Sequence, residues 1–278
     1  MKRFVDAAHN VFQVRENFAT CYGLYRAPIG QEPNQTEEQR ARERRLFSAE
    51  VRFLTFSDTV VAYVNLREDP TRMQGVFAIL STCTAVFKTM LAVGIPTRGA
   101  VDVGLADKLS DLRPQGIIGS GDDAVDVGYA HDVSEDEIYG PVLASVHRLE
   151  SRIAQWPRVV VGDGLIRYLQ LLVEPVDGIQ RDAGILKAAG LCHGFIAKDV
   201  DGWPVLDYLG QQQRDHVAER RATNEPAYGE RSAYRFVRNQ ARRYRDERNE
   251  KLAVRYNLTL QYFRSRAHLW PGMLDEGT

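Results

Sequence analysis

Three polar side chains lie in sequence contexts that could support phosphate chemistry. Asp58 falls in a short polar turn between two apolar runs, where a carboxylate can bind a hard divalent cation such as Mg²⁺. Arg98 precedes a glycine at the start of an apolar stretch, so its guanidinium could clamp a phosphate. Arg148 lies about two helical turns after Gly140 and could stabilise a developing negative charge. Taken alone, each residue also fits a plain structural role, as a turn former or a solvated arginine.

The elements that must position these residues follow from hydrophobic periodicity and turn residues. The expected helices are Phe4–Tyr25, Val76–Val93, Pro141–Ile153 and most of the chain from Gln211 onward. The expected strands are a hairpin of Val51–Phe56 and Val60–Val64, followed by Thr97–Gly104, Arg158–Val161 and Ala188–Ile196. This order predicts an α+β fold in which helices cover a mixed or antiparallel sheet.

Composition excludes several classes of protein. The 278 residues carry a net charge of −1, which argues against bulk binding to nucleic acid or to acidic membranes. No apolar run reaches the roughly 18 residues of a membrane span, and no signal peptide is evident, so we expect a cytoplasmic protein. Cys21, Cys83 and Cys192 are too few and too scattered for a disulfide framework or a zinc site. Gln211–Leu252 is locally basic, with 11 basic and 7 acidic residues, as a solvated helix face or a partner-binding face would be.

The motifs, taken in order, carry a family resemblance that no single one would. They are Phe56-Ser57-Asp58-Thr59, Arg98-Gly99, Tyr139-Gly140-Pro141, Leu149-Glu150 followed by Pro157-Arg158, and the Asp201–Leu209 segment. This series resembles the class III nucleotidyl cyclase domain. It is most similar to the bacterial pyrimidine nucleotide (uridylate or cytidylate) cyclases of Pycsar antiphage defence.

The resemblance implies a fold, an assembly and a reaction. It implies a cyclase-like domain with a ferredoxin-like core over residues 1–180 and a mostly helical C-terminal extension over residues 181–278. Such domains act as homodimers with the active site at the subunit interface, without nucleic acid or stable membrane insertion. Two Mn²⁺ or Mg²⁺ ions activate the ribose 3′-hydroxyl of a nucleoside triphosphate, whose attack on the α-phosphorus releases pyrophosphate. The product would be the 3′,5′-cyclic monophosphate of UTP or CTP, a second messenger in defence.

The same resemblance assigns roles to individual residues. Metal binding would fall to Asp58 and Asp6, and catalysis to Arg148, the transition-state arginine, and to Arg98. Leu54 takes the position of the adenine-reading lysine of adenylyl cyclases, which disfavours ATP. The residues that would contact substrate, including the base, are Arg52, Phe56, Thr59 and Glu137.

Two departures from the family pattern leave an alternative open. Asp6 has little chain before it and no Gly-Phe after it, so either it is a metal ligand on a stunted strand or the chain begins after the metal-bearing strand. Ala144 replaces an asparagine that orients the ribose in many cyclases. The alternative is a catalytically impaired, cyclase-like module that binds or senses a nucleotide. A third reading is an interaction protein that uses its basic C-terminal helices.

Overall fold

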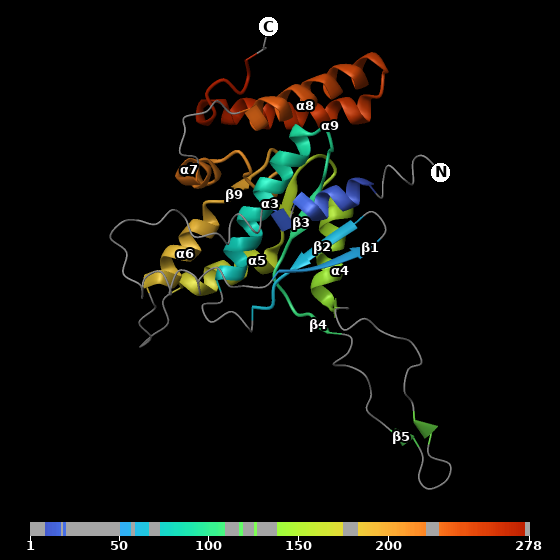
Figure 1. The fold of residues 1–278 in the computed structure, drawn as a ribbon, viewed down its shortest axis with the longest axis vertical. Helices are drawn as coiled ribbons and strands as arrows, with labels where there is room; N and C mark the ends of the chain where they lie inside the picture. Colours follow the sequence, from blue (N-terminus) through green and yellow to red (C-terminus); the bar gives the residue numbers. More distant parts are fainter. Residues whose placement is uncertain are drawn as a thin grey trace.

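The computed structural model describes a mixed α+β protein (Figure 1). The described residues are 9–17, 19–20, 51–56, 59–66, 73–108, 117–118, 125–126, 138–174, 183–220 and 228–275. Residues 9–17 are helical, as expected for that part of the first segment. The other helices are α3 (Gln74–Ala92), α4 (Pro141–Arg148), α5 (Asp163–Val173), α6 (Ala183–His193), α7 (Gln211–Arg220), α8 (Tyr228–Asp246) and α9 (Glu250–Arg266). A π-helical turn, η3 (Leu149–Ile153), continues α4, and a 3₁₀ turn, η4 (Ala267–Leu269), follows α9.

A four-stranded mixed sheet lies at the centre of the fold. Its order is β3 (Gly99–Val101), β8 (Val159–Val161), β10 (Pro204–Leu206) and β9 (Ile196–Lys198). Strand β3 is parallel to β8, while β10 is antiparallel to both of its neighbours. The three valines of β8 are all buried, because helices and neighbouring strands cover this strand on every side. Two further pairs are β4 (Asp107–Lys108) with β7 (Ile138–Tyr139), and β5 (Ile117–Ile118) with β6 (Val125–Asp126).

The expected hairpin is confirmed as a separate two-stranded sheet. Strand β1 (Arg52–Phe56) pairs antiparallel with β2 (Thr59–Tyr63). The expected strand at Ala188–Ile196 is wrong over most of its length, because α6 continues to His193 and β9 begins only at Ile196. An apolar run this short fits a buried helix end as well as it fits a strand, so its pattern could not decide between them.

Helix α3 is a core helix that packs against other elements on more than one side. One of its sides packs with the hairpin through Val86 and Met90, and Phe87 belongs to the larger core under the four-stranded sheet. The helix is long and apolar enough to cross a membrane by length and composition alone, but 67% of that apolar window is buried inside the protein. A burial of this extent is typical of a core helix.

The C-terminal helices are tied to the sheet by a polar clamp at the end of β10. Arg266 of α9 donates two hydrogen bonds to Asp207 Oδ2, from Nε at 3.0 Å and Nη2 at 2.8 Å, and Tyr262 donates to Asp207 Oδ1 at 2.8 Å. The Tyr262 hydroxyl also accepts from the backbone N–H of Leu209. Burial, with the nearby Asp207 charge, raises the pKa of Tyr262, so it stays a neutral donor. Because β10 pairs with β8, and β9 pairs with β10, this sheet includes strands from both sides of the expected division at residue 180.

A buried ion pair joins α3 to α8. Lys88 Nζ lies 2.6 Å from Glu230 Oε1, with the two side chains 9% and 0% exposed. The Lys88 ammonium also lies 4.9 Å from the centroid of the Trp270 ring, a cation–π contact. Within the described ranges the Glu230 carboxylate has no hydrogen-bond partner of good geometry, and the attraction of the two charges helps to offset its desolvation.

We expect Glu230→Gln to lower the free energy of unfolding by about 3–5 kcal/mol, because it removes the negative charge that faces the Lys88 ammonium in this buried pair. The double variant Lys88→Met, Glu230→Leu should recover most of this loss. Urea unfolding measures both variants. Glu247→Gln, which removes the partner of Arg243 in an exposed ion pair, is the control and should leave the unfolding curve unchanged. Equal curves for Glu230→Gln and the wild type would contradict the role of the pair.

Candidate functional site

The hairpin carries three of the four residues that we expected to contact substrate, and they lie at its two ends. Arg52 pairs with Tyr63 at one end of the register, and Phe56 pairs with Thr59 at the other. Phe53 packs toward α3, so alternation along β1 directs Arg52 to the opposite face of the hairpin. Arg52 is half-buried and Thr59 is exposed. The expected metal ligands Asp58 and Asp6, and the expected base-reading Glu137, lie outside the described residues.

Arg98, the expected phosphate clamp, is held by a carboxylate. It lies just before β3, and its Nε is 2.5 Å from Glu150 Oε1 in the π-helical turn η3. The two side chains are 47% and 22% exposed, so the pair is accessible to solvent. This ion pair joins two of the motifs, Arg98-Gly99 and Leu149-Glu150, across separate elements. A phosphate that binds Arg98 would have to compete with Glu150 for it.

Arg148 is the last residue of α4 and points into solvent. No ion pair or hydrogen bond joins its guanidinium to another residue in the part of the chain that the structure describes. Directly after it the helix widens into η3, where the Ala154 N–H donates to the Leu149 carbonyl at 2.9 Å. Widened turns of this kind occur frequently at functional sites. Arg148 is therefore an accessible cation at the end of a locally irregular helix.

The start of α4 explains the Tyr-Gly-Pro motif. Gly140 caps the helix with a φ of 153°, and a Cβ there would lie 2.5 Å from the carbonyl oxygen of Leu105. Pro141 occupies the first turn, where a missing N–H costs nothing. Only glycine therefore allows the chain to turn into α4 this close to the 105–106 backbone.

Asp102 is a structural residue close to these motifs that no sequence pattern singled out. It follows β3 and accepts hydrogen bonds from three groups: its neighbour's N–H at Val103 (2.9 Å), the Leu165 N–H in the first turn of α5 (2.8 Å), and the Ser145 hydroxyl of α4 (3.0 Å). A carboxylate at a helix N-terminus is stabilised by the free N–H groups and by the helix dipole. Asp102 thus ties one strand to two helices.

Two glycines make room for this carboxylate. A Cβ at Gly162 would overlap the Asp102 carboxylate, and a Cβ at Gly164 would lie 2.6 Å from its Oδ1 and overlap the Val103 carbonyl oxygen. In the sequence, the Gly162-Asp163-Gly164 triplet directly after the buried strand β8 indicates a close approach of another group. It does not indicate that this group is Asp102.

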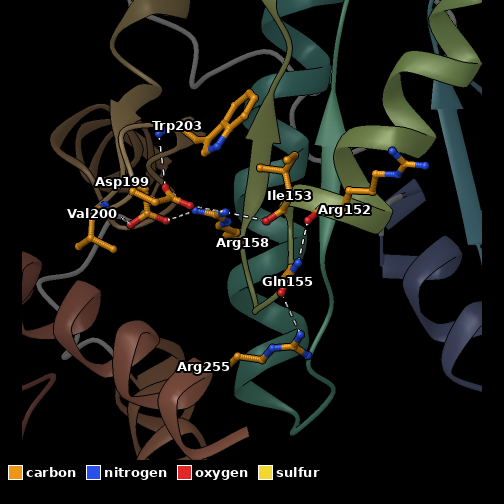
Figure 2. Close-up of polar contacts among 9 residues, drawn as sticks. Arg152, Ile153, Gln155, Arg158, Asp199, Val200, Trp203 and Arg255 are labelled. Carbon is orange, nitrogen blue, oxygen red and sulfur yellow. Dashed lines mark hydrogen bonds and ion pairs between the residues drawn. The ribbon is translucent and has the colours of Figure 1, made fainter. Parts of the chain in front are cut away.

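The side chain of Arg158, in the Pro-Arg motif, is buried and hydrogen-bonded to neighbouring segments of the chain (Figure 2). The side chain is 4% exposed and binds both Asp201 carboxylate oxygens at 2.9 and 2.8 Å, Asp199 at 2.7 Å and the Ile153 carbonyl at 2.6 Å. Its guanidinium stacks 3.6 Å above the centroid of the Trp156 ring. Burial raises the pKa of Asp201, but the hydrogen bond and charge of Arg158 outweigh it and hold that pKa below its ordinary value. Arg158 is therefore a structural tie to the β9–β10 turn.

The remaining nucleophile and metal-ligand candidates are weak within the described residues. Burial raises the pKa values of the Cys83 and Cys192 thiols to about 12, so both stay protonated and unreactive at neutral pH. The described residues contain no group of three or more histidine, cysteine or carboxylate side chains placed to hold a metal. Asp102 does not substitute for such a group, because its oxygens are already hydrogen-bonded.

Comparison with known proteins gives no independent identification. No protein-family model matches the chain, and neither the curated proteins nor the solved structures include a significant match. The functional reading therefore depends on the site itself.

We expect Gly164→Ala to lower the free energy of unfolding by about 2 kcal/mol or more, because the new methyl group overlaps Asp102 and the 103 carbonyl. Gly190→Ala is the matched control: a Cβ there meets nothing within 4 Å, and alanine should stabilise α6 slightly. Thermal unfolding of both variants gives the comparison. A Gly164→Ala protein as stable as the Gly190→Ala protein would contradict the close approach of Gly164 to Asp102 and to the Val103 carbonyl.

We expect Arg158→Gln to lower the free energy of unfolding at pH 7 by about 3 kcal/mol. We also expect the free energy of unfolding of this variant to fall less steeply than that of the wild type as the pH is lowered. The Asp201 pKa is lower in the folded protein, so its stabilisation exists above the ordinary aspartate pKa, about 3.9, and disappears as pH falls through the folded value. Without Arg158 this pH-dependent part vanishes. Urea unfolding from pH 7 down to about pH 3 measures it, and parallel pH profiles for the two proteins would count against the assignment.

Proposed function

We propose that the protein is a nucleotidyl cyclase that converts UTP or CTP to the 3′,5′-cyclic monophosphate and pyrophosphate. The observation that supports this proposal is the convergence of the motifs in space. The Gly99 N–H donates to the Arg158 carbonyl at 3.0 Å, and Arg98 pairs with Glu150. Asp102 then links the same strand to Ser145 of α4. Motifs separated by up to about 60 residues along the chain thus surround one strand pair, β3 and β8.

The proposed chemistry needs cations around a triphosphate. Arg148 is exposed and, among the described residues, unpaired, so it can donate to the charge that builds on the α-phosphoryl group. Arg98 can bind a phosphate when it leaves Glu150. The ribose 3′-oxygen loses its proton and attacks the α-phosphorus, while the bond to the bridging oxygen breaks and pyrophosphate leaves. Mn²⁺ or Mg²⁺, when bound by Asp58 and Asp6, would supply the activation of the 3′-hydroxyl.

We further propose that two copies of the chain form each active site. The support is the exposure of Arg148, whose guanidinium could complete the site of a second copy. Residues that contact the base would come from the hairpin, with Arg52, Phe56 and Thr59 beside Glu137. Leu54 at the position of an adenine-reading lysine favours a pyrimidine substrate, and the cyclic product would act as a messenger in antiphage defence.

The second candidate function is a nucleotide-binding module without turnover. One described contact favours it: Glu150 neutralises Arg98, so one of the two proposed catalytic cations is occupied. Ala144, exposed one turn before Arg148, offers no polar group to orient a ribose. A module of this kind would bind a triphosphate and release it unchanged.

The deciding experiment incubates the purified chain with Mn²⁺ and each of the four nucleoside triphosphates, then measures cyclic product and pyrophosphate. We expect turnover of UTP or CTP, and a loss of at least about 100-fold in kcat for Arg148→Ala with little change in nucleotide affinity. Arg152→Ala is the matched control, since Arg152 is an exposed arginine one turn later, and it should keep wild-type kcat.

The other outcomes are equally clear. Binding of a triphosphate without turnover of any of the four would establish the binding module instead. Equal activity of the Arg148→Ala and Arg152→Ala proteins would contradict the role assigned to Arg148. An Asp58→Ala protein that still turns over UTP or CTP would contradict the metal assignment.

A further inference from the structure

Helix α8 carries a stripe of arginines along one side. We call Arg231, Arg235, Arg238, Arg242 and Arg245 the arginine stripe; they are spaced by four, three, four and three residues. At 3.6 residues per turn this spacing places all five within an arc of about 80°, over a length of about 21 Å. The buried residues of α8, such as Val237 and Ala241, occupy the neighbouring face that packs on the core. The stripe therefore borders the core-facing side: Arg231, Arg235 and Arg238 are half-buried, and Arg242 and Arg245 are exposed.

The part of the chain that contains the stripe is strongly basic, although the whole chain is nearly neutral. Between residues 228 and 266 there are eleven basic and four acidic residues, a net charge of +7 in a chain whose total is −1. Within α8 the acidic residues are Glu230, which is buried against Lys88, and Asp246, the last residue of the helix. We expected no nucleic-acid partner because the total charge is close to zero. That total hides the local concentration of positive charge in residues 228–266.

Three members of the stripe have no neutralising partner among the residues that the structure describes. No ion pair or hydrogen bond joins Arg235, Arg242 or Arg245 to another residue in the described ranges, and Arg242 and Arg245 are exposed. Arg231 differs, since it donates to the Gly272 carbonyl at 2.9 Å and lies 3.7 Å from Asp275. A surface that keeps these three like charges one or two helical turns apart accepts mutual repulsion that a bound polyanion would relieve.

From these observations we infer that the arginine stripe binds the phosphate backbone of a nucleic acid, without sequence preference. Ten of the eleven cations in this region are arginine, whose planar guanidinium suits bidentate phosphate contacts. A duplex presents one negative charge per about 1.7 Å of its axis, so a 21 Å row of cations can contact several phosphates at once. An anionic membrane is less suitable, because the exposed large hydrophobic residues found among the described side chains include none from residues 229–246 of α8 that could anchor in lipid.

The test measures binding of the full chain to a fluorescein-labelled duplex of about 20 base pairs by anisotropy, from about 50 to about 200 mM salt. We expect log K to fall linearly with log salt. The variant Arg235→Gln, Arg242→Gln, Arg245→Gln should weaken binding at least about tenfold and reduce the slope by about 2–3. The control variant Arg243→Gln, Lys251→Gln, Arg264→Gln removes the same total charge outside the stripe and should keep most of the affinity and slope.

The inference is overturned by any of three results: no duplex binding at the lowest salt, equal losses in the two triple variants, or binding of phosphatidylserine vesicles that exceeds binding of the duplex. Circular dichroism and thermal unfolding of the variants show that each is folded. The stripe and the proposed cyclase site can be tested separately, because none of the substituted residues belongs to the site.

Discussion

Asp102 is the joint on which the arrangement around the candidate site depends. Its carboxylate binds the N-terminus of α5 and the Ser145 hydroxyl of α4 at the point where the chain leaves β3. Gly162 and Gly164 have no side chains, so β8 and α5 can approach this carboxylate closely. Since β3 and β8 are parallel neighbours, fixing their ends also fixes the direction in which α4 leaves, and with it the position of Arg148.

A second layer of charged contacts secures the C-terminal half of the chain to this centre. The Arg158 group holds the β9–β10 turn, Asp207 holds α9, and the pair of Lys88 with Glu230 holds α8 on α3. Each contact joins elements far apart in the sequence, and each is largely shielded from water. If one member of such a contact is removed, the other remains as a buried charge whose desolvation is no longer compensated. These contacts therefore favour one arrangement of the helices over its alternatives.

The sequence was informative where structure is local. The β1–β2 hairpin, the periodicity of α3 and the Gly140-Pro141 helix start all have short-range signals, and the structure confirms the strand pairing and the two helices. The Asp102 contacts to Ser145 and Leu165 span 43 and 63 residues, and no local pattern carries such information. The motif order suggested that Arg98 is a free clamp, but spacing could not reveal that Glu150 would hold it.

If the protein is a cyclase, the motifs around β3 and β8 form one triphosphate site. A crystal structure of the protein with Mn²⁺ and a UTP analogue that cannot cyclise is the sharpest test. We expect a triphosphate in contact with Arg148, from the same or a second copy of the chain, and an Arg98 side chain released from Glu150 toward a phosphate. A nucleotide bound elsewhere, with the Arg98–Glu150 pair intact and Arg148 still in solvent, would contradict it.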